Sequence, residues 1–309
     1  MNTSFKSLKN EDVFKLRRRS YVSIKDVCWL LYLYPGWAFA RTFPRLLSGL
    51  QPVGEFLARR LAKGEQKRLT ERLQLAGFGE MEIDSIVKRY LDRAVGRALC
   101  DLDLESVTQR LKPSNIHIQG LEYLQSAQES GQGIILISGH FFASRLAKSW
   151  LRSSGFSVLS VRHPAPPDPS LGVLGERYLQ GRYIRFLNKA IGEEVLIDDP
   201  ECTLKIVRRL RAGGLVNVHI DAPFASKTQD IIFLGKTHSF SSSVFRIAEL
   251  AGAAVIPFWF SGDHRDLRIV FEAPLDLGMD KAEELARVIR RLETQVIDKP
   301  YDYELWIML

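Results

Sequence analysis

The chain has 309 residues, of which 46% are hydrophobic and 26% are charged, and its formal net charge is +7. These values are typical of a globular protein, and they exclude a disordered chain and a polytopic membrane protein. The positive charge predicts an anionic partner such as a membrane surface, and no nucleic-acid recognition motif accompanies it, so we do not expect nucleic acid.

The N-terminal region combines a basic arm with a short apolar stretch. Residues 1–20 are basic and polar, and residues 27–40 read VCWLLYLYPGWAFA. This stretch is shorter than the roughly 20 apolar residues that a spanning helix needs, and Pro35-Gly36 interrupts it. Its tryptophans and tyrosines favour the depth of lipid headgroups. We therefore expect residues 1–45 to be a basic arm and an interfacial helix on an anionic membrane surface; the alternative is an ordinary helix packed on the domain.

The remaining residues, 46–309, are expected to form one α/β domain with a helical N-terminal part. Apolar residues at three- and four-residue spacing predict helices over Val53–Leu61, Glu65–Leu75 and Met81–Cys100. Short β-branched runs then predict buried strands at Gly133–Ser138, Ser157–Val161, Leu215–Ile220, Ala254–Phe260 and Leu267–Phe271. Helical patterns at 142–153, 170–187, 201–211 and 242–251 separate these runs, and another follows at 280–297. This alternation predicts a layered α/β sheet.

Two polar residues directly follow predicted strands. His140 comes after Gly133–Ser138, and Asp221 comes after Leu215–Ile220. Reactive groups in α/β sheets gather beyond the carboxyl ends of the strands, and an imidazole is a natural general base at neutral pH. Asp221 could equally be a turn or helix-capping residue before Ala222-Pro223.

An ordered series of motifs resembles the bacterial lipid A late acyltransferases, a branch of the lysophospholipid acyltransferase family. The series covers roughly residues 22–309 and consists of GIILISGHFF at 133–142, VRHP at 161–164, GGLVNVHID at 213–221, FLGK at 233–236, FSSS at 240–243, LAGAAVIP at 250–257 and YDYELW at 301–306. The resemblance implies a central mixed sheet flanked by helices and a catalytic His140. It also implies that no metal or bound cofactor is needed.

The same resemblance exposes one departure from the family pattern. In the family, a carboxylate five positions after the histidine (H-x4-D/E) orients the imidazole, whereas here that position holds Arg145. A nearby cation disfavours imidazolium and cannot accept a hydrogen bond from the ring. Two interpretations follow. Either another carboxylate orients His140, with Asp221 as the candidate and Arg145 bound to phosphate or to Asp221, or the site has lost acyl transfer and keeps only binding.

The remaining candidate residues bind substrate. Arg162 and Arg185 are expected in a cationic rim for a phosphorylated acceptor or carrier, and Gly235-Lys236 in a turn that presents backbone N–H groups to an anion. Aromatic residues are expected to line an acyl pocket: Phe141, Phe142 and Phe233. For the cations, the alternative in each case is an exposed surface charge.

The sequence thus predicts an acyltransferase that takes a fatty acyl group from an acyl carrier protein or coenzyme A thioester. The acceptor would be a hydroxyl or amine of a membrane lipid. The expected location is the cytoplasmic face of the bacterial inner membrane, and three widely spaced cysteines suit a reducing compartment. The alternative function is a catalytically impaired relative that binds an acyl carrier or lipid and supports a partner enzyme.

Overall fold

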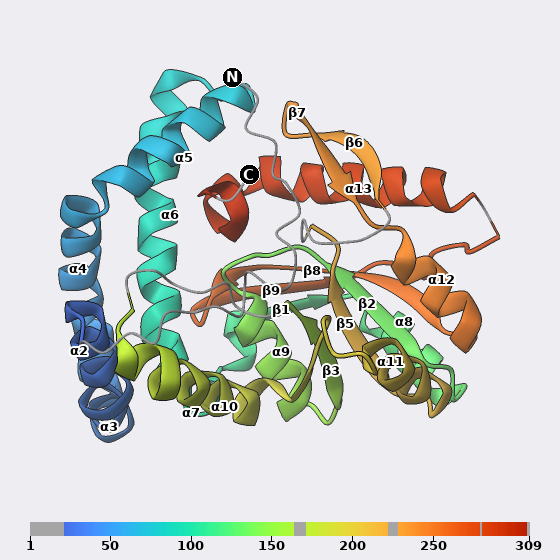
Figure 1. The fold of residues 1–309 in the computed structure, drawn as a ribbon, viewed down its shortest axis with the longest axis horizontal. Helices are drawn as coiled ribbons and strands as arrows, with labels where there is room; N and C mark the ends of the chain where they lie inside the picture. Colours follow the sequence, from blue (N-terminus) through green and yellow to red (C-terminus); the bar gives the residue numbers. More distant parts are fainter. Residues whose placement is uncertain (1–21, 164–170, 222–227, 279, 308–309) are drawn as a thin grey trace.

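A seven-stranded mixed sheet forms the centre of the molecule (Figure 1). The computed structural model describes residues 22–163, 171–221, 228–278 and 280–307. The strand order is β1-β9-β8-β2-β5-β3-β4. The bounds of these strands are β1 Ile116–Gln119, β2 Ile134–Ser138, β3 Val158–Arg162, β4 Glu193–Leu196, β5 Leu215–His219, β8 Ala254–Asp263 and β9 Asp266–Phe271.

All neighbouring strands of this sheet are parallel except β8 and β9, which form an antiparallel pair. The central strand β2 is buried along its whole length, because it pairs with β5 on one side and β8 on the other. Its continuous apolar run is the pattern of a strand covered on both faces. The expected central mixed sheet is therefore confirmed.

Helices cover both faces of the sheet (Figure 1). On one side lie α9 (Ser144–Ser153) and α11 (Cys202–Arg211). On the other side α13 (Lys281–Asp298) runs across the sheet, beside a separate hairpin of β6 (Gln229–Phe233) and β7 (Lys236–Phe240). The remaining helices of this region are α8 (Leu121–Glu129), α10 (Gln180–Ile191) and α12 (Ser243–Ala251). Short helical turns η4 (Pro300–Asp302) and η5 (Glu304–Ile307) follow α13.

The N-terminal part is helical, as expected. It runs through α2 (Ile24–Leu31), the π-helical turn η1 (Tyr32–Gly36), α3 (Trp37–Thr42), α4 (Pro44–Leu61), α5 (Lys63–Leu75), α6 (Glu80–Asp101) and α7 (Leu104–Gln109). Helix α6 stands upright beside the sheet, and α2, α3 and α4 lie along its outer side (Figure 1). The expected interruption at Pro35 coincides with η1. The basic arm of residues 1–20 lies outside the described residues.

The predicted strands and helices are found close to their expected bounds, and the differences are short elements. Strands β1 and β4 have four residues each. Burial alternates along β1 and is partial along β4, so neither strand contains the apolar run by which a buried strand is predicted. The hairpin of β6 and β7 is also polar on alternate residues. These elements depend on pairing with distant strands rather than on a local hydrophobic pattern.

Candidate active site

The site lies where β2 and β5 end. These strands are parallel neighbours, and their register pairs Ser138 with His219. Their carboxyl ends therefore meet at one edge of the sheet, and the residues that follow them, His140 and Asp221, are brought together. The structure confirms that both residues lie just beyond the carboxyl ends of these strands.

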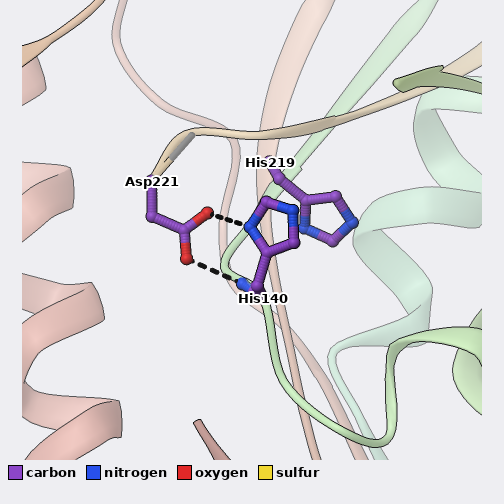
Figure 2. A group of neighbouring side chains, drawn as sticks. All are labelled: His140, His219 and Asp221. Carbon is purple, nitrogen blue, oxygen red and sulfur yellow. Dashed lines mark hydrogen bonds and ion pairs between the residues drawn. The ribbon is translucent and has the colours of Figure 1, made fainter. Parts of the chain in front are cut away.

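Asp221 holds His140 through two hydrogen bonds (Figure 2). One carboxylate oxygen, Oδ1, lies 2.6 Å from His140 Nδ1, and the other, Oδ2, accepts the backbone N–H of His140 at 2.7 Å. A carboxylate only accepts, so Nδ1 carries the ring proton and Nε2 keeps its lone pair. The Asp221 side chain is 1% exposed and that of His140 is 31% exposed, so the acid is enclosed while the imidazole remains accessible.

Gly139 makes this close approach possible. A Cβ atom at this position would lie 2.5 Å from Leu292 Cδ1 and 3.1 Å from Asp221 Oδ2. A side chain would therefore push the His140 backbone away from both α13 and the carboxylate. The requirement for glycine before His140 is steric.

The C-terminal segment fixes the loop that carries His140. The backbone N–H of Glu304 donates to the His140 carbonyl at 2.8 Å, and the N–H of Phe142 donates to the Asp302 carbonyl at 2.9 Å. Tyr303 is fully buried, and the pKa of its hydroxyl is raised by burial and by the charge of Asp221. The segment around Trp306 therefore supports the site directly.

Opposing effects act on the pKa of His140. Burial lowers this pKa, whereas the charge of Asp221 and the hydrogen bond to it raise it. Glu304 adds to the rise and Lys148 opposes it, and the net result is a pKa above the ordinary value of 6.5. Asp221 thus orients the ring and stabilises its protonated form, which is what an orienting acid does beside a general base.

A second histidine, His219, lies against His140 (Figure 2). The two rings are stacked with centroids 4.2 Å apart and an interplanar angle of 27°. Sequence reasoning missed His219 and its neighbour Lys148. The sequence did contain a signal for polar groups at this edge of the sheet. Asn217 and His219 are two residues apart on β5 and so lie on one face of the strand, and Ser144 and Lys148 are four residues apart and so lie on one face of α9.

Arg145 points away from this pair. Its guanidinium forms an ion pair with Asp101, at the end of α6, and donates to the Tyr183 hydroxyl at 2.6 Å. Tyr183 in turn donates to Asp101 at 2.9 Å. The expectation that Arg145 contacts Asp221 is wrong, because Asp101 neutralises it within a cluster of its own.

The three candidate phenylalanines occupy different surroundings. Phe141 is buried and packs edge-on against Phe260 and Tyr303, and Phe233 is buried against Tyr303 from the hairpin. Phe142 contacts Tyr90 and lines a cavity of about 180 Å³ between α6 and the His140 loop. Phe142 therefore lines a cavity as expected, whereas Phe141 and Phe233 pack within the core.

Two cavities adjoin the Arg145 cluster. The first contains Arg145 together with arginines of α6. The second, of about 280 Å³, lies between η1, α3 and α10 and is lined by Tyr32, Trp37 and Tyr183. Asp101 and Leu104 line both cavities, so the ion pair of Arg145 with Asp101 lies in the wall between them.

The candidate anion-binding residues are dispersed. Arg162 forms an ion pair with Glu194 at 2.9 Å, and Arg185 is exposed on α10. Gly235 lies in the turn of the β6–β7 hairpin, against the end of α5, and Lys236 is the first residue of β7. A neighbouring N–H of this turn, that of Leu234, already donates to Glu293. The structure therefore does not gather these four residues at His140.

His140, His219 and Asp221 offer donor atoms within 4.8 Å of one another, a spacing that a metal ion could use. These donors are already engaged. Both Asp221 oxygens face His140, and His219 Nε2 lies 3.1 Å from the Lys148 amino group. A cation beside this cluster disfavours a second cation, so the arrangement suits proton transfer better than metal binding.

Comparison with known protein families gives one match over nearly the whole chain. A family model described as bacterial lipid A biosynthesis acyltransferase matches residues 25–308. A search of curated proteins finds no match.

Proposed function

The chain belongs to the family of bacterial lipid A biosynthesis acyltransferases, and on this basis we propose that it transfers a fatty acyl group to a hydroxyl of a lipid A-like acceptor with His140 as general base. The observation that carries the proposal is the pair of hydrogen bonds that Asp221 accepts from His140. The pair supplies the orienting carboxylate that Arg145 does not.

The proposed reaction uses the free nitrogen of His140. Nε2 takes the proton of the acceptor hydroxyl, and the oxygen attacks the carbonyl carbon of an acyl thioester. The C–S bond then breaks, and the thiolate leaves with the proton that the imidazolium returns. Asp221 keeps Nδ1 protonated throughout, so that Nε2 is the nitrogen that exchanges the proton. The donor is a thioester of an acyl carrier protein or of coenzyme A.

A non-catalytic role, the alternative that the missing acid suggested, is less well supported. A site that had lost its chemistry would not need a carboxylate 1% exposed, aimed at both the ring and the backbone of His140. Burying such a group costs free energy, and enzymes accept that cost at sites that need it.

We also propose that the N-terminal helices lie on the cytoplasmic face of the inner membrane. Helix α4 has an inverted distribution of residues. Its exposed stripe is apolar, with large side chains at three- and four-residue spacing: Leu46, Leu50, Val53, Leu57 and Leu61. Polar residues on another side of the helix contact the protein instead: Arg59 pairs with Asp92 of α6 at 2.7 Å, and Gln51 accepts from Arg265 at 2.6 Å. An apolar environment outside the protein accounts for this inversion.

The charges beside this stripe suit an anionic membrane. Within residues 22–61, the two acidic residues are both shielded, Asp26 being buried and Glu55 partly buried. Arg41 and Arg60 are exposed. Within the described residues, no helix has both the length and the hydrophobicity needed to cross a bilayer. The proposal is therefore partial immersion of α4 beside the α2–α3 segment that the sequence had singled out.

The test of the reaction is replacement of the base. His140→Ala should reduce turnover at least about 10²-fold, the lower end for a positioned base, in an assay with acyl carrier protein or coenzyme A thioesters and a lipid A precursor in mixed micelles. The thermal midpoint should fall only modestly, because the side chain is partly exposed and Asp221 keeps the backbone N–H of His140 as a partner. A folded His140→Ala protein with full turnover would show that the proposed mechanism is wrong.

A further inference from the structure

Lys148 is an unusual residue for the interior of α9. It is 7% exposed, and within the described part of the chain it forms no ion pair. Its amino group lies 3.1 Å from His219 Nε2. Lysines are seldom buried without a carboxylate, because the ammonium group loses its hydration. Lys148 exchanges no proton in the proposed reaction.

The contacts of His219 fix its proton. Its Nδ1 lies 2.9 Å from the Gly139 carbonyl oxygen, which only accepts, so Nδ1 carries the hydrogen. Nε2 therefore has the lone pair and accepts from Lys148. Burial, followed by the charges of His140 and Lys148, lowers the pKa of His219 well below 6.5. The ring is therefore neutral and aligned, with Lys148 at its far end.

His140 consequently has a partner on each side. Asp221 is at the edge of its ring, and the face of the ring is covered by His219 (Figure 2). Behind His219 is the amino group of Lys148. The negative charge on one side favours a proton on His140, and the positive charge on the other side disfavours it.

Other charged groups act on His140 and Lys148. Glu304 of η5 acts on both His140 and Lys148, and His163, after β3, is coupled to His140. Glu194 of β4 and Arg145 of α9 act on Lys148 in opposite directions. Burial outweighs these effects and lowers the pKa of Lys148 to about 8. Lys148 is therefore mostly protonated below this pH, neutral pH included.

We propose that Lys148 and His219 are positioning residues. The neutral ring of His219 stacks on His140, and the positive charge of Lys148 behind it opposes the charge of Asp221, so that His140 is held in one orientation and remains available as a base near neutral pH. Asp221 alone would favour a protonated resting state, which cannot accept a proton from the acceptor. The role of this charge balance in catalysis rests on the proposed function. The effect of Asp221 and Lys148 on the protonation of His140 can be measured without a substrate.

The test is the titration of His140 in charge-neutral variants. The chain has six histidines, so the ring signals of isotope-labelled protein can be resolved by NMR, and His140 is assigned by its loss in His140→Gln. Lys148→Gln removes the charge but keeps an N–H donor for His219, whereas Lys148→Met removes both. Both variants should shift the midpoint of His140 upward by about half a unit or more.

A matched control removes a positive charge from the exposed side of the same helix. Arg152→Gln should leave the His140 midpoint unchanged, because solvent screens that charge. Both Lys148 variants should also melt at a higher temperature than the parent at pH 7, since each removes a buried charge. If one variant does not fold, the other one still decides the test.

Two outcomes would overturn the proposal. The first is an unchanged His140 midpoint in a folded Lys148 variant, which together with a lowered melting temperature would make Lys148 merely structural. The second is a shift in Lys148→Met that Lys148→Gln does not reproduce, which would assign the effect to the hydrogen bond rather than to charge. If the Lys148 variants shift the His140 midpoint but the parent protein catalyses no acyl transfer, the proposed function alone is refuted.

Discussion

The carboxylate of Asp221 binds the ring and the backbone N–H of His140, a residue 81 positions earlier in the chain. The two oxygens have separate tasks. One sets the tautomer of the imidazole, and the other fixes the peptide from which the imidazole projects. The family carboxylate five residues after the histidine would lie on α9 instead, where Arg145 is turned toward α6. The orienting acid therefore comes from β5 rather than from the helix after His140.

Asp221→Asn should lower kcat by about 10²–10⁴, because an amide can present its N–H to Nδ1 and favour the wrong tautomer. The pKa of His140 should fall at the same time, since the negative charge that raises it is gone. The measurements are kcat and the titration of His140. Asp84→Asn, at an exposed position on α6, is the control, because it removes the same charge away from the site. Unchanged turnover in Asp221→Asn would mean that another group orients His140.

The pH profile of kcat/KM should have its acid limb above pH 6.5. The base must be unprotonated, and the pKa of His140 is raised above 6.5. The stability of the fold depends on pH in the opposite direction. A raised folded-state pKa stabilises the fold below pH 6.5, and this contribution is lost as the pH rises through the folded-state pKa. Initial rates between pH 5 and pH 9 test the limb, and activity that does not fall down to pH 5 would contradict a histidine base.

Arg145→Glu should destabilise the protein rather than restore activity. The new carboxylate would face Asp101, which is 2% exposed, and disruption of such a pair costs about 3–5 kcal/mol. Arg59→Glu is the matched control, because Arg59 also pairs with an aspartate of α6 but is 37% exposed, and exposed pairs contribute about 0–1 kcal/mol. Urea unfolding measures both. A stable Arg145→Glu protein with greatly increased acyl transfer would show that the family spacing, and not Asp221, governs the site.

Replacing the exposed stripe of α4 should weaken membrane binding. The triple variant Leu50→Ser, Val53→Ser and Leu57→Ser should bind anionic vesicles at least about tenfold less well, because each side chain gives up burial in lipid. The control replaces three equally exposed apolar residues outside this region with serine: Leu204, Ile232 and Leu250. Vesicle flotation compares the two, and equal binding of both triple variants would contradict a role for α4.

The sequence by itself determined the elements whose information is local. The apolar run before His140 is recognisable as a strand because both faces of β2 are covered, and the run before Asp221 because it contains β-branched residues. Three- and four-residue spacing identified α5, α6 and α13 in the same way. Placing His140 and Asp221 at strand ends required only these patterns and the general rule for α/β sheets.

The tertiary structure decided which side chains meet. Nothing near Arg145 in the sequence indicates Asp101 as its partner, since the two are 44 residues apart and come from different helices, α9 and α6. The same holds for Lys148 and His219, which come from a helix and a strand 71 residues apart. Periodicity gives the face on which a residue lies but not what lies opposite, because the opposing surface is set by the order and register of the strands. In this protein, that order places β5 beside β2 and so provides His140 with an acid that the local motif lacks.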